Sequence, residues 1–151
     1  MQLYIMRHGD AIQYARTDAE RPLSDKGRQQ SAAMASCFKS SLPTRVIASP
    51  YLRAQQTCAI VCEGLGIKHF DTVDGITPDV DPNGVIRLLQ PYENETLLMV
   101  SHQPLVGSLV SLLVQGNMEG GFMMGTASVA LLQLDQVGPG QAALQWLRHA
   151  S

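Results

Sequence analysis

Two arginines and two histidines stand just after apolar runs of the chain. Arg7 and His8 follow the first run, Arg53 lies shortly after the second, and His102 follows the most apolar one. A guanidinium group can donate paired hydrogen bonds to phosphate oxygens. A neutral imidazole is a competent nucleophile towards phosphorus near neutral pH. These residue types therefore predict chemistry on a phosphoryl group, provided that the fold brings them together.

The surroundings of Arg53 strengthen this prediction. Ser49 and Pro50 predict the N-cap and the first residue of a helix, so Arg53 should lie in its first turn. Free N–H groups at a helix start favour an anion. The chain has no phosphate-binding Gly-rich loop and no cysteine nucleophile with arginine support. A metal phosphatase needs several carboxylates near the histidines, and only Asp10 is close in sequence, so we expect no metal and no cofactor.

The elements that must position these residues alternate along the chain. Residues 2–6, 44–48 and 96–100 have the apolar character of short strands, and residues 68–73 are a candidate for a further short strand. Residues 74–84 form a loop rich in Asp, Pro and Gly. Helices are predicted for about 15 residues after Ser24, after Ser49-Pro50 up to the glycines at 64 and 66, near residues 85–90, and after Pro104. The tail, residues 126–134 and 142–149, predicts a hairpin with its turn at residues 137–140.

This order predicts an α/β fold in a single domain spanning residues 1–151. We expect a three-layer sandwich, with a mostly parallel central sheet, an antiparallel edge and helices on both faces. Ligands of such folds bind outside the carboxyl ends of the strands. The two arginines and two histidines all fall at that edge.

Composition excludes several classes of protein. Of the 151 residues, 45% are hydrophobic and 16% charged, which indicates a packed globule, and the net charge of −2 gives no basic surplus for nucleic acid. No apolar stretch approaches the roughly 20 residues that span a bilayer, and no signal-peptide core precedes Arg7. Three cysteines form no even set of disulfides, which favours the cytoplasm. Cys58 and Cys62 have helical spacing, and core packing is a better interpretation than metal binding because no partner pair exists.

Several motifs resemble those of the histidine phosphatase superfamily, which includes the phosphoglycerate mutases. Arg7-His8-Gly9 after an N-terminal strand is similar to its signature, and residues 22–27 (PLSDKG) to its helix-opening segment. Residues 49–57 (SPYLRAQQT) and 100–102 (VSH) look like its second and third motifs, and the order is the same throughout the chain. The short length and the segment 101–107 (SHQPLVG) most resemble the SixA-type phosphohistidine phosphatases.

The resemblance implies a phosphoglycerate mutase-like fold and a role for each matching residue. His8 would be the nucleophile, and Arg7, Arg53 and His102 would hold the phosphoryl oxygens. Arg21 would be a further contact to the phosphate or to the protein that carries it, although it could equally form a surface ion pair with Asp18 or Glu20. Asp10 could orient His8 or serve only as a turn residue.

The region after the third predicted strand lacks an obvious acid for the leaving group. Larger members of the superfamily usually have one there, whereas this chain has Asp79 and Asp81, which are also typical turn formers. General-acid help is typically worth about a hundredfold to ten-thousandfold for a poor leaving group such as an alkoxide. A protonated phosphohistidine ring departs as a neutral imidazole and needs less help.

The sequence therefore predicts a cytoplasmic hydrolase for protein-bound phosphohistidine that damps a phosphorelay or phosphocarrier pathway. The partner would be a phosphotransfer domain or a phosphocarrier, with no nucleic acid and no membrane involved, and nothing in the chain demands more than a monomer. The first alternative is a phosphatase of small phosphoesters. The second is a phosphate-binding module without catalysis, which the four intact positions disfavour.

Overall fold

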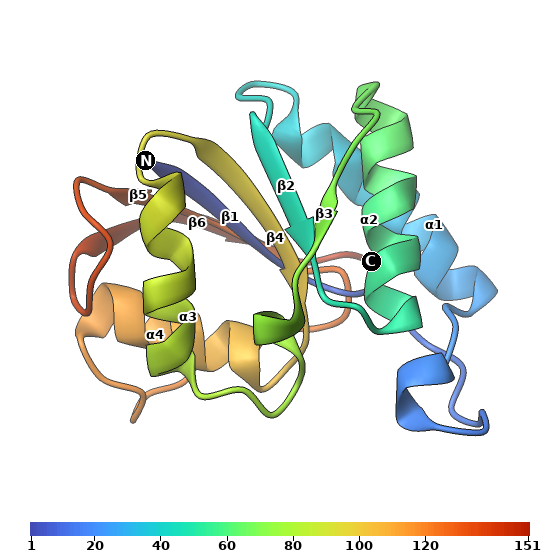
Figure 1. Cartoon of the computed structure of the whole chain (residues 1–151). Coiled ribbons are helices and arrows are strands. Elements are labelled where there is room, and N and C mark those ends of the chain that lie inside the picture. Colours follow the sequence, from blue (N-terminus) through green and yellow to red (C-terminus); the bar gives the residue numbers. More distant parts are fainter.

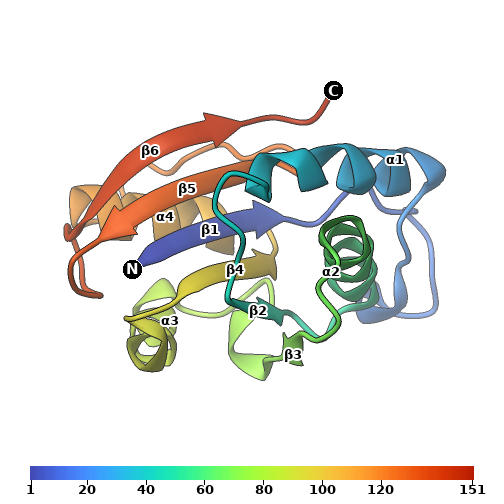
Figure 2. The same cartoon turned by 90° about the horizontal axis from the view of Figure 1, so that it is seen from above.

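Six strands form one sheet in the computed structural model, which describes residues 1–151. Figure 2 shows the strand order β3-β2-β4-β1-β5-β6. Neighbours from β3 to β1 are parallel, whereas β5 is antiparallel to β1 and β6 to β5. The predicted parallel sheet with an antiparallel edge is confirmed. The strands are β1 (Gln2–Arg7), β2 (Arg45–Ala48), β3 (Asp71–Thr72), β4 (Thr96–Ser101), β5 (Val129–Leu134) and β6 (Ala142–Arg148).

Helices cover both faces of the sheet, which confirms the three-layer architecture. Figure 1 shows α1 and α2 on one side of the sheet and α3 and α4 on the other. None of the helices combines the length and apolar character needed to cross a membrane. The helices are α1 (Asp25–Met34), α2 (Leu52–Leu65), α3 (Pro82–Leu89) and α4 (Leu105–Gln115), with short 3₁₀ turns at Asp18–Glu20, Ala35–Phe38, Asp74–Ile76 and Gln90–Tyr92.

The two faces of β1 supply two separate cores. Leu3 and Ile5 pack with α3 and α4, whereas Tyr4 and Met6 pack with α1 and α2, and all four are fully buried. Successive side chains of a strand point to opposite faces of a sheet. A strand covered on both faces is therefore apolar without interruption, which is why β1 and β4 are the most recognisable strands in the sequence.

Two predicted helix starts need correction. Helix α2 begins at Leu52 and not at Pro50, and its N-cap Tyr51 makes no side-chain capping bond. Ser49 does not cap the helix because its hydroxyl is hydrogen-bonded to His102, the residue that follows the neighbouring strand β4. Helix α3 begins earlier than predicted, at Pro82, because the Asp81 side chain accepts a hydrogen bond from the backbone N–H of Asn83 and caps the helix.

Gly27 lets α1 approach the loop that follows β1. A Cβ atom at this position would lie 2.0 Å from the carbonyl oxygen of Asp10, a backbone atom that cannot turn aside. The same approach is anchored by Ser24, whose side chain accepts the N–H of Gly27 and donates to an Asp10 carboxylate oxygen at 2.6 Å. The absence of a side chain at residue 27 thus fixes where the chain leaves His8.

We expect Gly27→Ala to destabilise the protein and Gly84→Ala to leave it intact or stabilise it. Overpacking against backbone typically costs about 1–3 kcal/mol. Gly84 lies in α3, and no atom lies within 4 Å of the place that an alanine methyl group would take there. Alanine gains up to about 1 kcal/mol over glycine inside a helix. Urea unfolding of both variants measures the difference. Equal free energies of unfolding for the two variants would contradict this explanation of Gly27.

Candidate active site

His8 lies at the carboxyl end of β1, and each of its ring nitrogens has a defined hydrogen-bond partner. Its Nδ1 is 2.7 Å from the carbonyl oxygen of Gly9. A carbonyl oxygen can only accept, so Nδ1 carries the ring proton and Nε2 keeps its lone pair. The Arg53 Nε–H group donates to Nε2 at 3.2 Å. His8 therefore presents an unprotonated nitrogen next to a cation, as a nucleophile towards an anionic group requires.

The two predicted arginines converge on this histidine. Arg53 is buried in the first turn of α2, in contact with His8. Arg7 donates from Nη1 to the carbonyl oxygen of Met124 at 2.9 Å, and its Nε is buried without a partner. Burial and the charge of Arg53 lower the pKa of Arg7, as expected where guanidinium groups gather without an anion between them.

His102 completes the group from the end of β4. Its ring centroid is 5.2 Å from that of His8, and its Nε2 is 2.6 Å from the Ser49 hydroxyl oxygen. Its Nδ1 is buried and has no hydrogen-bond partner. The Nδ1 of His102 and the Nε of Arg7 are the two buried side-chain polar atoms without a partner. Both belong to residues that the sequence assigned to a phosphoryl group.

Burial and positive charge keep both imidazoles neutral. Burial lowers the pKa of His8 to about 4, with further lowering by the charges of Arg53, Arg7 and Arg21. Burial also lowers the pKa of His102 to about 3, followed by the effects of His8 and Arg53. At pH 7 the positive charge of the site therefore resides on arginines, and His8 keeps the lone pair that a nucleophile needs.

Arg21 forms an ion pair with Asp18, which is one of the alternatives that the sequence left open for this arginine. Arg21 donates from Nη1 to an Asp18 carboxylate oxygen at 3.0 Å, which is one of the two surface pairs considered for it. The sequence did not reveal that Asp18 also holds Arg53. Arg53 donates to the Asp18 backbone oxygen at 2.7 Å and to its other carboxylate oxygen at 3.2 Å. Asp18 thus joins two arginines, and the hydrogen bond from Arg21 is the main cause that lowers the pKa of its carboxyl group.

Two buried polar residues that sequence analysis missed hold the loop after His8. The Thr57 hydroxyl accepts the Gly9 N–H at 3.0 Å and donates to the carbonyl oxygen of Arg53 at 2.8 Å. Gln30 accepts the Asp10 N–H at 2.9 Å. Asp10 itself bonds to Ser24 and makes no hydrogen bond to His8, which favours the turn interpretation. A buried polar residue on an otherwise apolar helix face was the available signal for Thr57.

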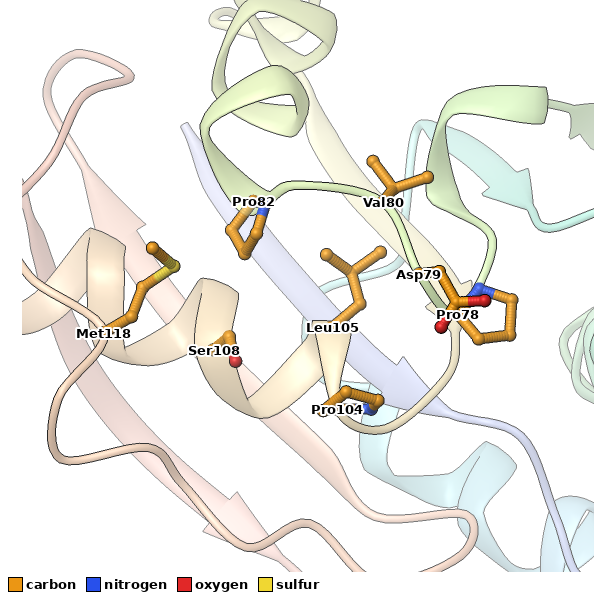
Figure 3. A pocket seen from close by; sticks show the side chains of 8 residues that line it. All are labelled: Pro78, Asp79, Val80, Pro82, Pro104, Leu105, Ser108 and Met118. Carbon is orange, nitrogen blue, oxygen red and sulfur yellow. The ribbon is translucent and has the colours of Figure 1, made fainter.

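Neither candidate acid makes a hydrogen bond or an ion pair with any of the four central side chains. Asp81 caps α3, and Asp79 is exposed on the wall of a pocket of about 280 Å³. Figure 3 shows Asp79 beside Pro78, across this pocket from Ser108 and Met118. The pocket reaches Pro104 but includes none of the four central side chains. No group of three or more His, Cys, Asp or Glu side chains is arranged to hold a metal ion.

Comparisons with known proteins identify relatives of the chain. Residues 3–76 match the family described as "Histidine phosphatase superfamily (branch 1)". The chain is 39% identical over 146 residues to phosphohistidine phosphatase SixA of Escherichia coli K12, covering 93% of this chain and 89% of that protein. It is 35% identical over 124 residues to a SixA homolog of Haemophilus influenzae, covering 74% and 76%.

A solved structure extends the likeness to the whole fold. The protein histidine phosphatase SixA complexed with tungstate superposes with a TM-score of 0.90 at 35% identity, covering 99% of this chain and 97% of the other. This agreement and the sequence relatives confirm the predicted fold class. The chain therefore belongs to the histidine phosphatase superfamily, branch 1, and within it to the SixA type that its motifs predicted.

Proposed function

We propose that this protein hydrolyses protein-bound phosphohistidine by way of a phosphoryl group carried on its own His8. The observation that carries the proposal is the lone pair of His8 Nε2, which lies beside Arg53 while Nδ1 is tied to the Gly9 carbonyl. Arg7, Arg53 and His102 would bind the phosphoryl oxygens. The binding of tungstate, a tetrahedral oxyanion, by the related SixA supports such a site.

In the first step the Arg53 Nε–H group exchanges its hydrogen bond to His8 Nε2 for one to a phosphoryl oxygen. The freed Nε2 lone pair attacks phosphorus, and the bond from phosphorus to the substrate imidazole breaks. The electron pair of that bond returns to the substrate ring, which leaves as neutral imidazole if its other nitrogen already carries a proton. Arg53 and Arg7 balance the charge of the transferring group. Because departure then needs no further proton, the lack of a contacting acid at Asp79 or Asp81 favours phosphohistidine over a phosphoester substrate.

In the second step water attacks the phosphorus of phospho-His8 and releases inorganic phosphate. The Nδ1–H bond to Gly9 supports this step. With a proton on Nδ1 and phosphorus on Nε2, the ring of the intermediate is cationic, and it departs as neutral imidazole. The hydrogen bond to a carbonyl oxygen stabilises that charged ring, and both protons of the attacking water stay on the product, which leaves as dihydrogen phosphate and then equilibrates with solvent.

Exposed apolar side chains around the site support a protein substrate. Six large apolar side chains are exposed, and four of them lie at the carboxyl edge of the sheet, three on loops and Leu52 at the first position of α2. The carbonyl oxygen of Ile12 bonds to Arg21, Leu52 precedes Arg53, and Met123 precedes the Met124 carbonyl that bonds to Arg7. Exposed apolar groups gathered on one face are typical of interaction sites. We call Ile12, Tyr14, Leu52 and Met123 the apolar rim.

The partner would be a phosphotransfer domain or a phosphocarrier, and the reaction would damp the pathway that phosphorylates it. The 39% sequence identity to SixA, in an alignment that covers 93% of this chain, favours this substrate over small phosphoesters. We infer that residues 1–151 act as a single domain and as a monomer. We also infer a cytoplasmic location, supported by the SixA relatives and by three free, buried cysteines.

The central test is to trap the phosphoryl group. A protein phosphorylated on histidine with labelled phosphate should transfer label to the enzyme as an acid-labile, alkali-stable adduct. His8→Ala should abolish the adduct and lower turnover by about a thousandfold or more, because the nucleophile is lost. His69→Ala is the matched control, since His69 is exposed away from the site. Activity retained by His8→Ala, or much faster turnover of sugar or glycerate phosphates, would refute the proposal.

A second prediction follows from the lowered pKa values of the two histidines. The pKa values of about 4 for His8 and about 3 for His102 mean that both rings stay neutral from pH 7 down to about pH 5. NMR titration of the ring signals in the free enzyme measures this directly. Because unfolding restores a pKa near 6.5, the unfolded chain binds more protons, and stability should fall as pH drops from about 6.5 towards 4. Midpoints near 6.5 for these rings would contradict the burial argument.

The apolar rim makes a third prediction. Tyr14 and Met123 are each 84% exposed, and large side chains of these types often carry much of an interface's binding energy. The double variant Tyr14→Ser, Met123→Ser should lower kcat/KM for a phosphohistidine protein about tenfold or more, mainly through KM. Hydrolysis of phosphoramidate, a small P–N substrate, should change less than about twofold because it cannot reach the rim.

The control for the rim is Leu42→Ser. Leu42 is exposed to 51% and lies on the loop before β2, at the opposite edge of the sheet. Leu42→Ser should leave kcat/KM unchanged for both the phosphohistidine protein and phosphoramidate. An equal loss for both substrates in the double variant would show that the rim acts on the site itself, and no loss for either would exclude the rim from substrate binding.

A further inference from the structure

Ser49 is buried at the end of β2 in contact with His102. Its side chain is fully inaccessible, and its hydroxyl oxygen is 2.6 Å from His102 Nε2. The same oxygen accepts the backbone N–H of Tyr51 at 3.3 Å. The position of Ser49 is fixed by the sheet, because its N–H donates to the carbonyl oxygen of Val100 on the neighbouring strand.

The Ser49 hydroxyl proton has one acceptor within reach. A buried hydroxyl group loses free energy if its proton is unpaired, and His102 Nε2 is the atom available to accept it. If Nε2 instead carried the ring proton, the Nε2–H group would donate to the Ser49 oxygen. The Ser49 hydroxyl proton would then have no acceptor. A hydrogen bond from the Ser49 hydroxyl therefore requires Nε2 as its acceptor, and the ring proton of His102 must then lie on Nδ1.

We propose that Ser49 is a positioning residue that holds His102 in the tautomer with its proton on Nδ1, so that the ring meets a phosphoryl oxygen as a hydrogen-bond donor. The proposal rests on the proposed function of the site. Its second support is that Nδ1 is the buried ring atom with no partner in the protein. A lone pair at that position would repel a phosphoryl oxygen, whereas an N–H group attracts it.

The surroundings explain why a dedicated residue is needed. A neutral imidazole has a single N–H group, and burial together with the charges of His8 and Arg53 keeps the His102 ring neutral by lowering its pKa. Protonation cannot supply a second donor near pH 7. The ring of Tyr51 lies edge-on at 5.0 Å and that of His8 at 5.2 Å, which leaves little room for the His102 ring to reorient. The choice of tautomer therefore falls to the contact at Nε2.

Nitrogen-15 NMR of the wild-type protein tests the proposal without any variant. The ring of His102 should show its proton on Nδ1 at pH 7, with assignment by His102→Ala. In Ser49→Ala we expect a mixture of tautomers, and in Ser111→Ala, which removes a buried hydroxyl group from α4, we expect the wild-type spectrum. A wild-type ring that carries its proton on Nε2 would overturn the proposal.

Binding of inorganic phosphate supplies a functional readout that is independent of the phosphohistidine substrate. Ser49→Ala should raise the dissociation constant about tenfold, equivalent to about 1.4 kcal/mol, with a parallel loss in kcat/KM. In a His102→Ala background the same substitution should have little further effect, because Ser49 acts through His102. Equal losses in both backgrounds would mean that Ser49 supports only the local structure, and this would also overturn the proposal.

These measurements separate the inference from the proposed function. Failure of the enzyme on phosphohistidine proteins, with the Nδ1 tautomer and the coupled loss of phosphate binding intact, would contradict the function alone. Turnover of phosphohistidine with an Nε2 tautomer would contradict only the role of Ser49. Urea unfolding of each variant checks that the fold persists.

Discussion

Hydrogen bonding between three parallel strands is the constraint on which the site depends. The central strand β4 lies between β1 and β2, and at their carboxyl ends the His8 N–H donates to the Ser101 carbonyl at 2.9 Å while the Ser49 N–H donates to the Val100 carbonyl at 3.0 Å. These two bonds put residues from three distant parts of the sequence within one site. Helix α2 then starts just beyond β2 and brings Arg53 to His8. A change of register in either strand pair would separate the proposed nucleophile from the groups proposed to bind phosphate.

The site also has to hold several guanidinium groups together before any phosphate arrives. Arg7 and Arg53 lie close enough for the charge of Arg53 to lower the pKa of Arg7. Asp18 offsets part of this repulsion, since it contacts both Arg53 and Arg21 while remaining on the protein surface. Because the contact is exposed on one side, water screens it, and its contribution to stability is small. Its main effect is on geometry, since it occupies the two terminal nitrogens of Arg53 and leaves Nε directed at His8.

The sequence predicted what depends on local pattern and missed what depends on contacts across the sheet. Continuous apolar runs revealed β1 and β4, and strand ends followed by Arg and His revealed the site residues. Ser-Pro is a local start signal and predicts a helix cap at Ser49, whereas the Ser49 hydroxyl bonds to His102, 53 residues away. Thr57 and Asp18 were missed for the same reason, since their partners Gly9 and Arg53 lie 48 and 35 residues distant. No spacing rule within one element can predict such bonds.

In the proposed reaction the two histidines have opposite roles although their side chains are identical. In both rings the proton resides on Nδ1, held on His8 by the carbonyl of the next residue and on His102 by the inferred bond from Ser49. The rings differ in the nitrogen that they present to the site. His8 presents Nε2 with its lone pair beside Arg53, and His102 presents Nδ1, the atom without a partner. One ring can therefore attack phosphorus while the other donates to a phosphoryl oxygen. Neither role requires a change of protonation before the reaction begins, because burial keeps both rings neutral.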